Sequence, residues 1–340
     1  MTALRFELPP ELEASAPPAS RDAVRLLVAE PSGVRHARFA DFAEYLQPGD
    51  VLVVNTSGTL AAAVEGRRGD GRAVTVHFST ALDDQVWLVE VRPRVRAGGP
   101  VPDARVDETI ELPAGVQLRL IAPYPAGSPA PRLWFAKAAV EGGVRDYLSR
   151  VGRPIRYAYV PQPHSIDDYQ TVFARDPGSA EMPSAGRPFT PRIVTDLVVR
   201  GVAIAPVTLH TGVSSQEGGE PPLAEPFHVP PATARLVNVT RAAGGRVVAV
   251  GTTVARALES AATDRGGVRP RSGWTDLLLG PERPARVVTG LVTGWHAPGA
   301  SHLRLLEAVG GAELVAKAYA AALEERYLWH EFGDSCLLLP

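Results

Sequence analysis

The sequence is poor in cysteine and has no long apolar run, and each scarcity excludes a class of protein. Its single cysteine, Cys336, rules out an intramolecular disulfide and cannot by itself form a zinc site. No stretch approaches the roughly 20 apolar residues of a membrane-spanning helix. The amino-terminal residues contain no apolar segment of the signal-peptide type. We therefore expect a cytoplasmic protein with no membrane partner.

A large excess of charge of either sign is also missing. The formal net charge is −2 at pH 7, which gives no overall attraction to nucleic acid. A local basic patch would not show in that sum, and the candidates for one are Arg67, Arg68, Arg72, Arg92, Arg94 and Arg96. Interspersed arginines are more often solvated surface residues, so their grouping on one face stays open.

The pattern of apolar residues changes twice along the 340 residues, a length that favours about two domains. From about residue 60 to 150, short alternating runs are joined by turn-like pieces, as in a small antiparallel barrel or sandwich. Before and after this block, apolar strands alternate with helices. The sequence therefore predicts an α/β main domain, residues 1–59 and 151–340, with an inserted small antiparallel β-barrel domain at 60–150.

Local apolar spacing and turn residues place the elements of the main domain. We expect strands at Val51–Val54, Val202–Leu209, Val247–Val250 and Val287–Val292, and helices at Asp41–Leu46, Ser301–Val309 and Ala312–Tyr327.

The most informative stretch is Val247–Ser260, in which an apolar strand runs through Gly251, Thr252 and Thr253 directly into a helix. Either threonine could cap that helix and leave backbone N–H groups at its positive end facing a ligand. An ordinary capped connection has the same sequence, so this turn alone does not decide between the two.

Other loops of this kind follow the strands of the main domain. His210 lies after one strand, and Trp295 and His296 lie after another. Because α/β folds bind ligands at the carboxyl ends of their strands, an imidazole or an indole there could contact a polar or aromatic ligand. Residues 169–190 are too rich in proline, glycine and serine for regular structure, and long irregular segments often lie beside a site.

Seven motifs together resemble one family. They are YQTVFA, PSAGRPFT, VTLHTG, VGTTVARALESA, SGWTDL, VTGWHAP and FGDSCLL, in the order and spacing found in the S-adenosylmethionine:tRNA ribosyltransferase-isomerases of queuosine synthesis. The resemblance implies an α/β domain carrying a smaller β-barrel. It also implies transfer and isomerisation of the ribosyl group of S-adenosylmethionine onto 7-aminomethyl-7-deazaguanine in tRNA, which gives epoxyqueuosine and releases adenine and methionine, without a metal.

The chain departs from the family pattern at several polar positions. Arg187 and Pro188 stand where the family has leucine and histidine, and Phe332 stands where it has tyrosine. Two arginines of the family are missing near Gly58 and Ala63. Proline can neither donate a hydrogen bond nor titrate, so a proton carrier is absent at Pro188.

The resemblance and the loop chemistry together predict the site. Candidate catalytic residues are His296, His210, Asp276 and Asp334, the histidines as proton shuttles and the carboxylates to orient them or to face the sulfonium. Candidate substrate-binding residues are Ser184, Ala185, Gly186, Gly251, Thr252, Thr253, Arg256, Trp274, Trp295 and Glu225. Within this set, Gly251–Thr253 is expected to hold ribose hydroxyls or the methionine carboxylate, and Trp295 to stack on a base.

Three functions remain open from the sequence. The first is the family reaction on tRNA, and the second is a related transfer from S-adenosylmethionine to another acceptor, such as a free deazapurine or a small amine. The third is binding of a ligand without turnover. The missing arginines favour the second over the first, whereas the resemblance favours the first.

Overall fold

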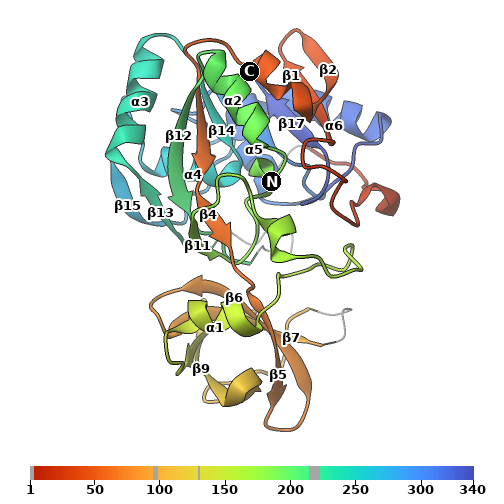
Figure 1. Ribbon diagram of the computed structural model, residues 1–340, viewed down its shortest axis with the longest axis vertical. Helices are drawn as coiled ribbons and strands as arrows, with labels where there is room; N and C mark the ends of the chain where they lie inside the picture. Colours follow the sequence, from red (N-terminus) through yellow and green to blue (C-terminus); the bar gives the residue numbers. More distant parts are fainter. Residues whose placement is uncertain (1–3, 95–98, 129–130, 214–222) are drawn as a thin grey trace.

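The computed structural model describes residues 4–94, 99–128, 131–213 and 223–340, and Arg96 therefore lies outside the described residues. Two bodies are visible in Figure 1, a larger one built on an open sheet and a smaller barrel joined to it through extended segments. Within the described residues, no helix has both the length and the apolar character that crossing a membrane requires.

A nine-stranded sheet forms the main domain, in the order β15-β13-β12-β3-β14-β16-β17-β1-β2. Its strands are β1 (Arg25–Glu30), β2 (Gly33–Arg38), β3 (Val51–Asn55), β12 (Ala203–Leu209), β13 (Glu225–Val229), β14 (Val247–Val250), β15 (Arg271–Thr275), β16 (Gly290–Thr293) and β17 (Ser335–Leu338). The central strands β12, β3, β14 and β16 are parallel. Their carboxyl ends consequently meet at one edge of the sheet.

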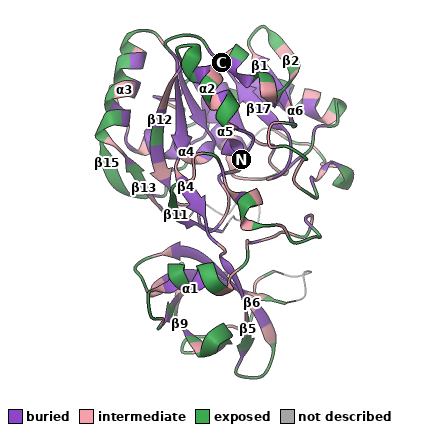
Figure 2. Ribbon diagram, viewed as in Figure 1, coloured by how far each residue is buried: buried purple, intermediate pink, exposed green. Residues whose placement is uncertain are grey.

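Both faces of this sheet are covered, as the fully buried strands β3, β14 and β16 require. Leu27 and Val53 belong to one core, with α3 (Pro231–Ala242), α4 (Thr252–Ser260), α5 (His302–Gly310) and α6 (Ala312–Glu324). Leu26 and Leu52 point to the other, with α2 (Pro191–Val199) and the 3₁₀ helix η2 (Phe39–Tyr45). Figure 2 shows the sheet as a continuous buried layer between exposed helix surfaces.

The inserted body is a closed antiparallel barrel in the order β10-β7-β6-β5-β8-β9. Its strands are β5 (Ala63–Arg68), β6 (Ala73–Ala81), β7 (Val86–Pro93), β8 (Thr109–Leu112), β9 (Val116–Tyr124) and β10 (Leu133–Ala138), with η3 (Pro113–Gly115) between β8 and β9. The predicted fold class is confirmed. Helix α1 (Val144–Val151) adds Tyr147 and Leu148 to the barrel core, and on this basis we propose residues 60–150 as the inserted domain.

Short elements connect the two bodies and approach the site. A two-stranded parallel sheet pairs β4 (Ser57–Thr59) with β11 (Asp176–Ser179). The 3₁₀ helices η1 (Pro10–Leu12), η4 (Ile166–Tyr169) and η5 (Ser184–Gly186) lie in the irregular parts of the chain.

Several predicted elements differ in detail from the structure. The helix expected at Asp41–Leu46 is the 3₁₀ helix η2, and the strand expected to begin at Val287 begins at Gly290. Glu259 explains the second difference, because its carboxylate accepts hydrogen bonds from the backbone N–H groups of Val287 and Val288. These two N–H groups therefore donate to a side chain of α4 and not to the backbone of a neighbouring strand.

Candidate functional site

A cavity of about 260 Å³ lies at the carboxyl ends of the central strands. It brings together segments that are far apart in the sequence. The predicted residues that line it are Ser184, Ala185, Glu225, Gly251, Thr252, Thr253, Arg256, Trp295 and His296. The remaining predicted residues, namely Gly186, His210, Trp274, Asp276 and Asp334, do not line it.

The amino end of α4 forms one wall of this cavity. Gly251 is the N-cap residue, with φ of 93°, and no side chain hydrogen-bonds to the cap. The prediction that Thr252 or Thr253 caps the helix is therefore wrong, because both belong to its first turn. The positive end of the helix dipole reaches the cavity without a side-chain acceptor, which is the arrangement that binds anions in other proteins.

The turn from Ser184 to Gly186 packs directly against this helix end. A Cβ atom placed on Gly251 would lie 3.3 Å from the Cβ of Ala185. The positive φ of Gly251 also disfavours any residue with a side chain. Glycine therefore allows η5 and α4 to approach closely enough to share one wall.

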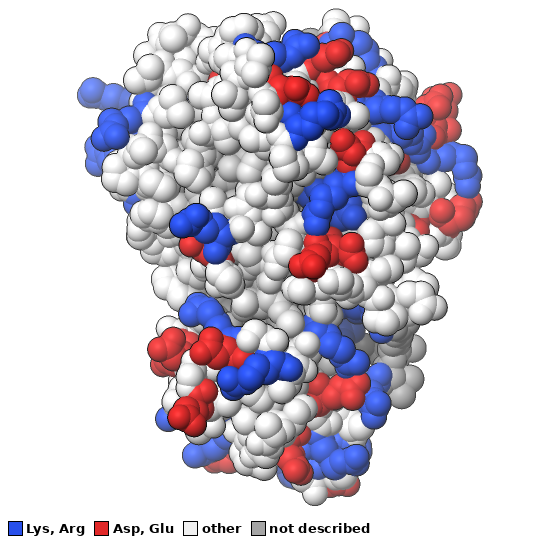
Figure 3. All heavy atoms as spheres, in the orientation of Figure 1, with Lys and Arg blue, Asp and Glu red and all other residues white. Residues whose placement is uncertain are grey.

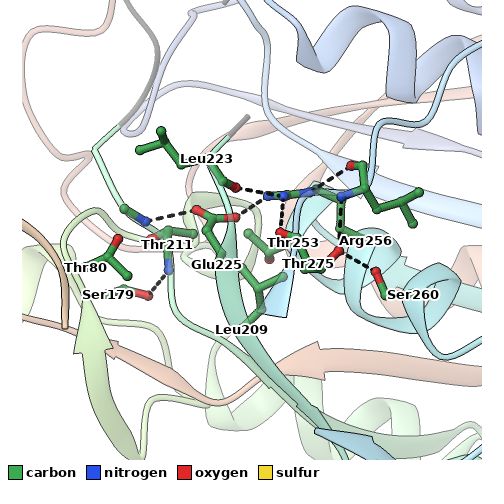
Figure 4. A network of polar contacts seen from close by, with 12 residues as sticks. Thr80, Ser179, Leu209, Thr211, Leu223, Glu225, Thr253, Arg256, Ser260 and Thr275 are labelled. Carbon is green, nitrogen blue, oxygen red and sulfur yellow. Dashed lines mark hydrogen bonds and ion pairs between the residues drawn. The ribbon is translucent and has the colours of Figure 1, made fainter. Parts of the chain in front are cut away.

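Arg256 and Glu225 form a buried ion pair in the cavity lining, and Figure 4 shows their charged groups pointing toward each other. The same guanidinium donates to the carbonyl oxygens of Thr275 at 3.0 Å and Leu223 at 3.2 Å. Glu225 accepts from the backbone N–H of Gly212 at 2.9 Å. Because these groups satisfy one another, the pair holds β13, β15 and α4 in place around the cavity.

Two histidines stack in the wall formed by β16 and α5. The ring centroids of His296 and His302 are 4.6 Å apart and the rings are nearly parallel, at 7°. Burial lowers the pKa of His302 to about 4 and lowers the pKa of His296 well below its ordinary value, with a further contribution from His302. Both imidazoles are therefore neutral near pH 7.

The hydrogen bonds around His296 indicate its tautomer. Thr293 Oγ1 donates its proton to the carbonyl oxygen of Gly294 at 3.0 Å and lies 3.1 Å from His296 Nε2. A hydroxyl has one proton to donate, so His296 Nε2 is the donor in this contact. Nδ1 is then left as the acceptor atom of the neutral ring.

Trp295 lies deeper than expected for a stacking residue, with 2% of its surface exposed. The rings of Tyr319, Tyr327 and Trp329 pack against it, with centroids 5.0, 5.8 and 5.4 Å away. Its Nε1–H has no hydrogen-bond partner among the described residues. This indole can therefore contact a ligand through its N–H donor and not through an open ring face.

The sequence did not single out one further group of residues in the cavity lining. Its members are Tyr157, Tyr159, Tyr169, Glu181 and Glu331, and we call this group the tyrosine–carboxylate lobe. Tyr169 and Glu181 lie in the irregular segment that we expected beside a site. The other three carry no motif, because they come from loops that only the fold brings together.

His210 and Asp334, which lie outside the cavity, have structural partners. His210 Nδ1 lies 2.7 Å from Ser57 Oγ, and its ring packs against Gly178, between β4 and β11. Asp334 pairs with Arg25 at 3.2 Å and accepts a hydrogen bond from the backbone N–H of Leu328 at 2.8 Å. These contacts fix the loop before β17.

The other predicted residues that do not line the cavity lie beside it or on the surface. Trp274 is 50% exposed on β15, and Asp276 is exposed immediately before the cavity residue Leu277. Gly186 is buried against Thr171, where a Cβ atom would meet the threonine methyl at 3.2 Å.

Four of the barrel arginines lie beside acidic partners. Arg68 pairs with Asp103 and Glu108, Arg72 with Asp70 and Asp103, Arg92 with Glu90, and Arg94 with Glu65. The face drawn in Figure 3 accordingly shows acidic and basic side chains interspersed. Among the described residues, no group of three or more histidine, cysteine, aspartate or glutamate side chains is arranged to hold a metal ion.

Comparison with known proteins gives one consistent result. A family model described as "Queuosine biosynthesis protein" matches residues 1–338. The chain is 37% identical to the S-adenosylmethionine:tRNA ribosyltransferase-isomerase of Moorella thermoacetica and 36% identical to that of Symbiobacterium thermophilum, with 98% of each chain covered in both cases. It is also similar to the crystal structure of S-adenosylmethionine tRNA ribosyltransferase from Thermotoga maritima, with a TM-score of 0.55, 28% identity and coverage of 98% and 99%.

The Glu225–Arg256 pair allows a stability test. Arg256→Met leaves a buried carboxylate without its cation, and we expect it to lower the free energy of unfolding by about 3–5 kcal/mol. Adding Glu225→Gln should restore part of this loss, because the uncompensated charge is then gone. A double-mutant cycle measured by urea unfolding checks the coupling. Additive effects of the two substitutions would contradict the interpretation of the pair as one unit.

His302 predicts a dependence of stability on pH. The folded chain keeps this imidazole neutral down to about pH 4, whereas the unfolded chain protonates it near its ordinary pKa of 6.5. The corresponding stability is fully present above pH 6.5 and is lost as the pH falls toward 4. We expect His302→Asn to reduce that loss by on the order of 2 kcal/mol, measured by urea unfolding across this range. The exposed His228, substituted in the same way, should leave the slope unchanged.

Proposed function

The chain belongs to the queuosine biosynthesis protein family, and from that membership we propose that it transfers and isomerises the ribosyl group of S-adenosylmethionine onto 7-aminomethyl-7-deazaguanine in tRNA. The products are epoxyqueuosine in the tRNA, adenine and methionine. S-adenosylmethionine is a substrate in this reaction, and no metal takes part. A cytoplasmic location is part of the proposal.

The cavity supports this proposal because its walls differ in charge character. The uncapped amino end of α4 suits an anion, and S-adenosylmethionine has one anionic group, the methionine carboxylate. The tyrosine–carboxylate lobe belongs to the same cavity lining and suits positive charge. A zwitterionic ligand with a sulfonium can therefore align its two ends with the two walls.

His296 is the candidate for proton transfer within the cavity. The acceptor amine must lose a proton before it attacks, and the departing adenine must gain one. Because Nε2 donates to Thr293, Nδ1 is the atom that can take the proton lost by the amine and give it to the departing adenine. His210 does not line the cavity, so it is a weaker candidate for proton transfer than His296.

Removing the imidazole tests this role. We expect His296→Ala to slow adenine release from S-adenosylmethionine by about 10²–10⁴-fold, the usual contribution of a positioned acid–base group. Chromatographic measurement of adenine under single-turnover conditions, with tRNA bearing 7-aminomethyl-7-deazaguanine, gives the rate. His228→Ala changes an exposed histidine on β13 and should leave the rate unchanged. Equal rates for His296→Ala and the parent protein would remove His296 from the mechanism.

The helix end is tested by adding a methyl group to it. Gly251→Ala introduces strain at a positive φ and pushes against Ala185, so we expect S-adenosylmethionine affinity to fall at least tenfold. Gly244→Ala is the matched control, because Gly244 also has a positive φ, 79°, but nothing lies within 4 Å of its Cβ position. Both variants should lose about 1 kcal/mol of stability, and calorimetry should show weaker binding for Gly251→Ala alone. Unchanged binding in Gly251→Ala would show that S-adenosylmethionine does not bind at the amino end of α4.

A further inference from the structure

The tyrosine–carboxylate lobe contains a partly buried carboxylate, that of Glu331, with an unusual set of neighbours. Tyr159 Oη donates to Glu331 Oε2 at 2.7 Å, and Tyr157 donates to Glu181. No arginine, lysine or histidine of the described chain forms an ion pair with Glu331, although Arg187 is near enough to act on its charge. Burial accordingly raises the pKa of Glu331, since the hydrogen bond from Tyr159 offsets the desolvation only in part.

The aromatic rings around this carboxylate form a stacked wall. The Tyr157 and Tyr159 centroids are 5.7 Å apart at 25°, and His330 stacks on Tyr159 at 4.1 Å and 12°. Tyrosine faces carry partial negative charge and attract cations. The aromatic wall and the carboxylates thus both favour a cationic ligand group.

Tyr169 gives an independent indication that the lobe is a ligand site. Its side chain is 4% exposed and lines the cavity, and its hydroxyl has no hydrogen-bond partner among the described residues. Burial, followed by the charge of Glu331, raises the pKa of this hydroxyl to about 12. An unpartnered buried hydroxyl costs free energy unless a ligand satisfies it.

We propose that the tyrosine–carboxylate lobe is the subsite that receives a cationic group of the substrates, an alkylammonium or a sulfonium. The inference rests on the proposed function, because that reaction supplies such groups from two sources. One source is S-adenosylmethionine, with its sulfonium and its methionyl ammonium. The other is the aminomethyl group of the acceptor base.

The position of the lobe in the cavity agrees with this assignment. Glu181 is three residues before Ser184, and Ser184 and Ala185 pack at the amino end of α4. One short segment therefore links the cationic subsite to the helix end that we assign to the carboxylate. A single zwitterionic ligand can contact both.

Glu331→Gln tests the inference, because it keeps the shape of the side chain and removes its charge. Calorimetry on the full chain should compare S-adenosylmethionine, S-adenosylhomocysteine and methylthioadenosine, which have two, one and no cationic groups. A second comparison pairs 7-aminomethyl-7-deazaguanine with its 7-cyano analogue, which lacks the amine. Exposed Glu111 on β8 supplies the matched control, Glu111→Gln.

We expect Glu331→Gln to weaken the binding of at least one cationic probe tenfold or more. The affinity for the analogue that lacks the cationic group should change less than about twofold. Loss confined to S-adenosylmethionine assigns the sulfonium, loss shared with S-adenosylhomocysteine assigns the methionyl ammonium, and loss confined to the aminomethyl base assigns the acceptor amine. Glu331→Asp keeps the charge and should recover part of the preference.

Equal weakening of all probes, or weakening of none, would overturn the inference. Adenine release by the parent protein with modified tRNA is measured in parallel and keeps the two proposals distinguishable. If the parent protein turns over and Glu331→Gln loses no preference for cationic probes, only the assignment of the lobe as a cationic subsite is rejected. Absence of turnover in the parent rejects the proposed function.

Discussion

The cavity depends on one backbone constraint, the junction at Gly251 where β14 ends and α4 begins. Only glycine takes the required positive φ without strain and lets Ala185 approach to the distance seen. The parallel strands bring their carboxyl ends to this edge, and the helix that follows β14 turns its amino end toward them. The remaining walls are arranged around that point, including the His296–His302 stack and the Glu225–Arg256 pair.

Charge is distributed unequally around this junction, and this distribution suits the ligand groups of the proposed ribosyl transfer. Paired groups such as Arg256 and Glu225 are satisfied by each other and serve to hold the walls. The groups left for a ligand are the amino end of α4, the neutral imidazoles and the lobe around Glu331. Two departures from the family pattern lie next to that lobe, since the Arg187 guanidinium is 5.0 Å from the Phe332 ring centroid and the Phe332 ring is 5.1 Å from that of Tyr169. Arg187 and Phe332 therefore belong to the surroundings of the proposed cationic subsite.

The sequence predicted what depends on local pattern and failed where tertiary contacts decide. Alternating runs predicted the barrel, and the strand and turn at Val247–Gly251 placed the helix end correctly. The capping role of the threonines was wrong because the glycine takes the cap position. Tyr157, Tyr159 and Glu331 could not be found, since they lie on loops with no periodicity and meet only in the folded chain. Asp334, predicted as a site residue from its motif, does not line the cavity, and its hydrogen bonds hold a turn.

The central claim is that this cavity performs ribosyl transfer from S-adenosylmethionine to a modified base in tRNA. Mass spectrometry of the reaction with S-adenosylmethionine and tRNA bearing 7-aminomethyl-7-deazaguanine tests it most directly, because it follows small products and the base together. We expect adenine, methionine and an epoxycyclopentane-bearing base in equal amounts. Adenine release without a change in the mass of the tRNA base, or no adenine at all, would contradict it.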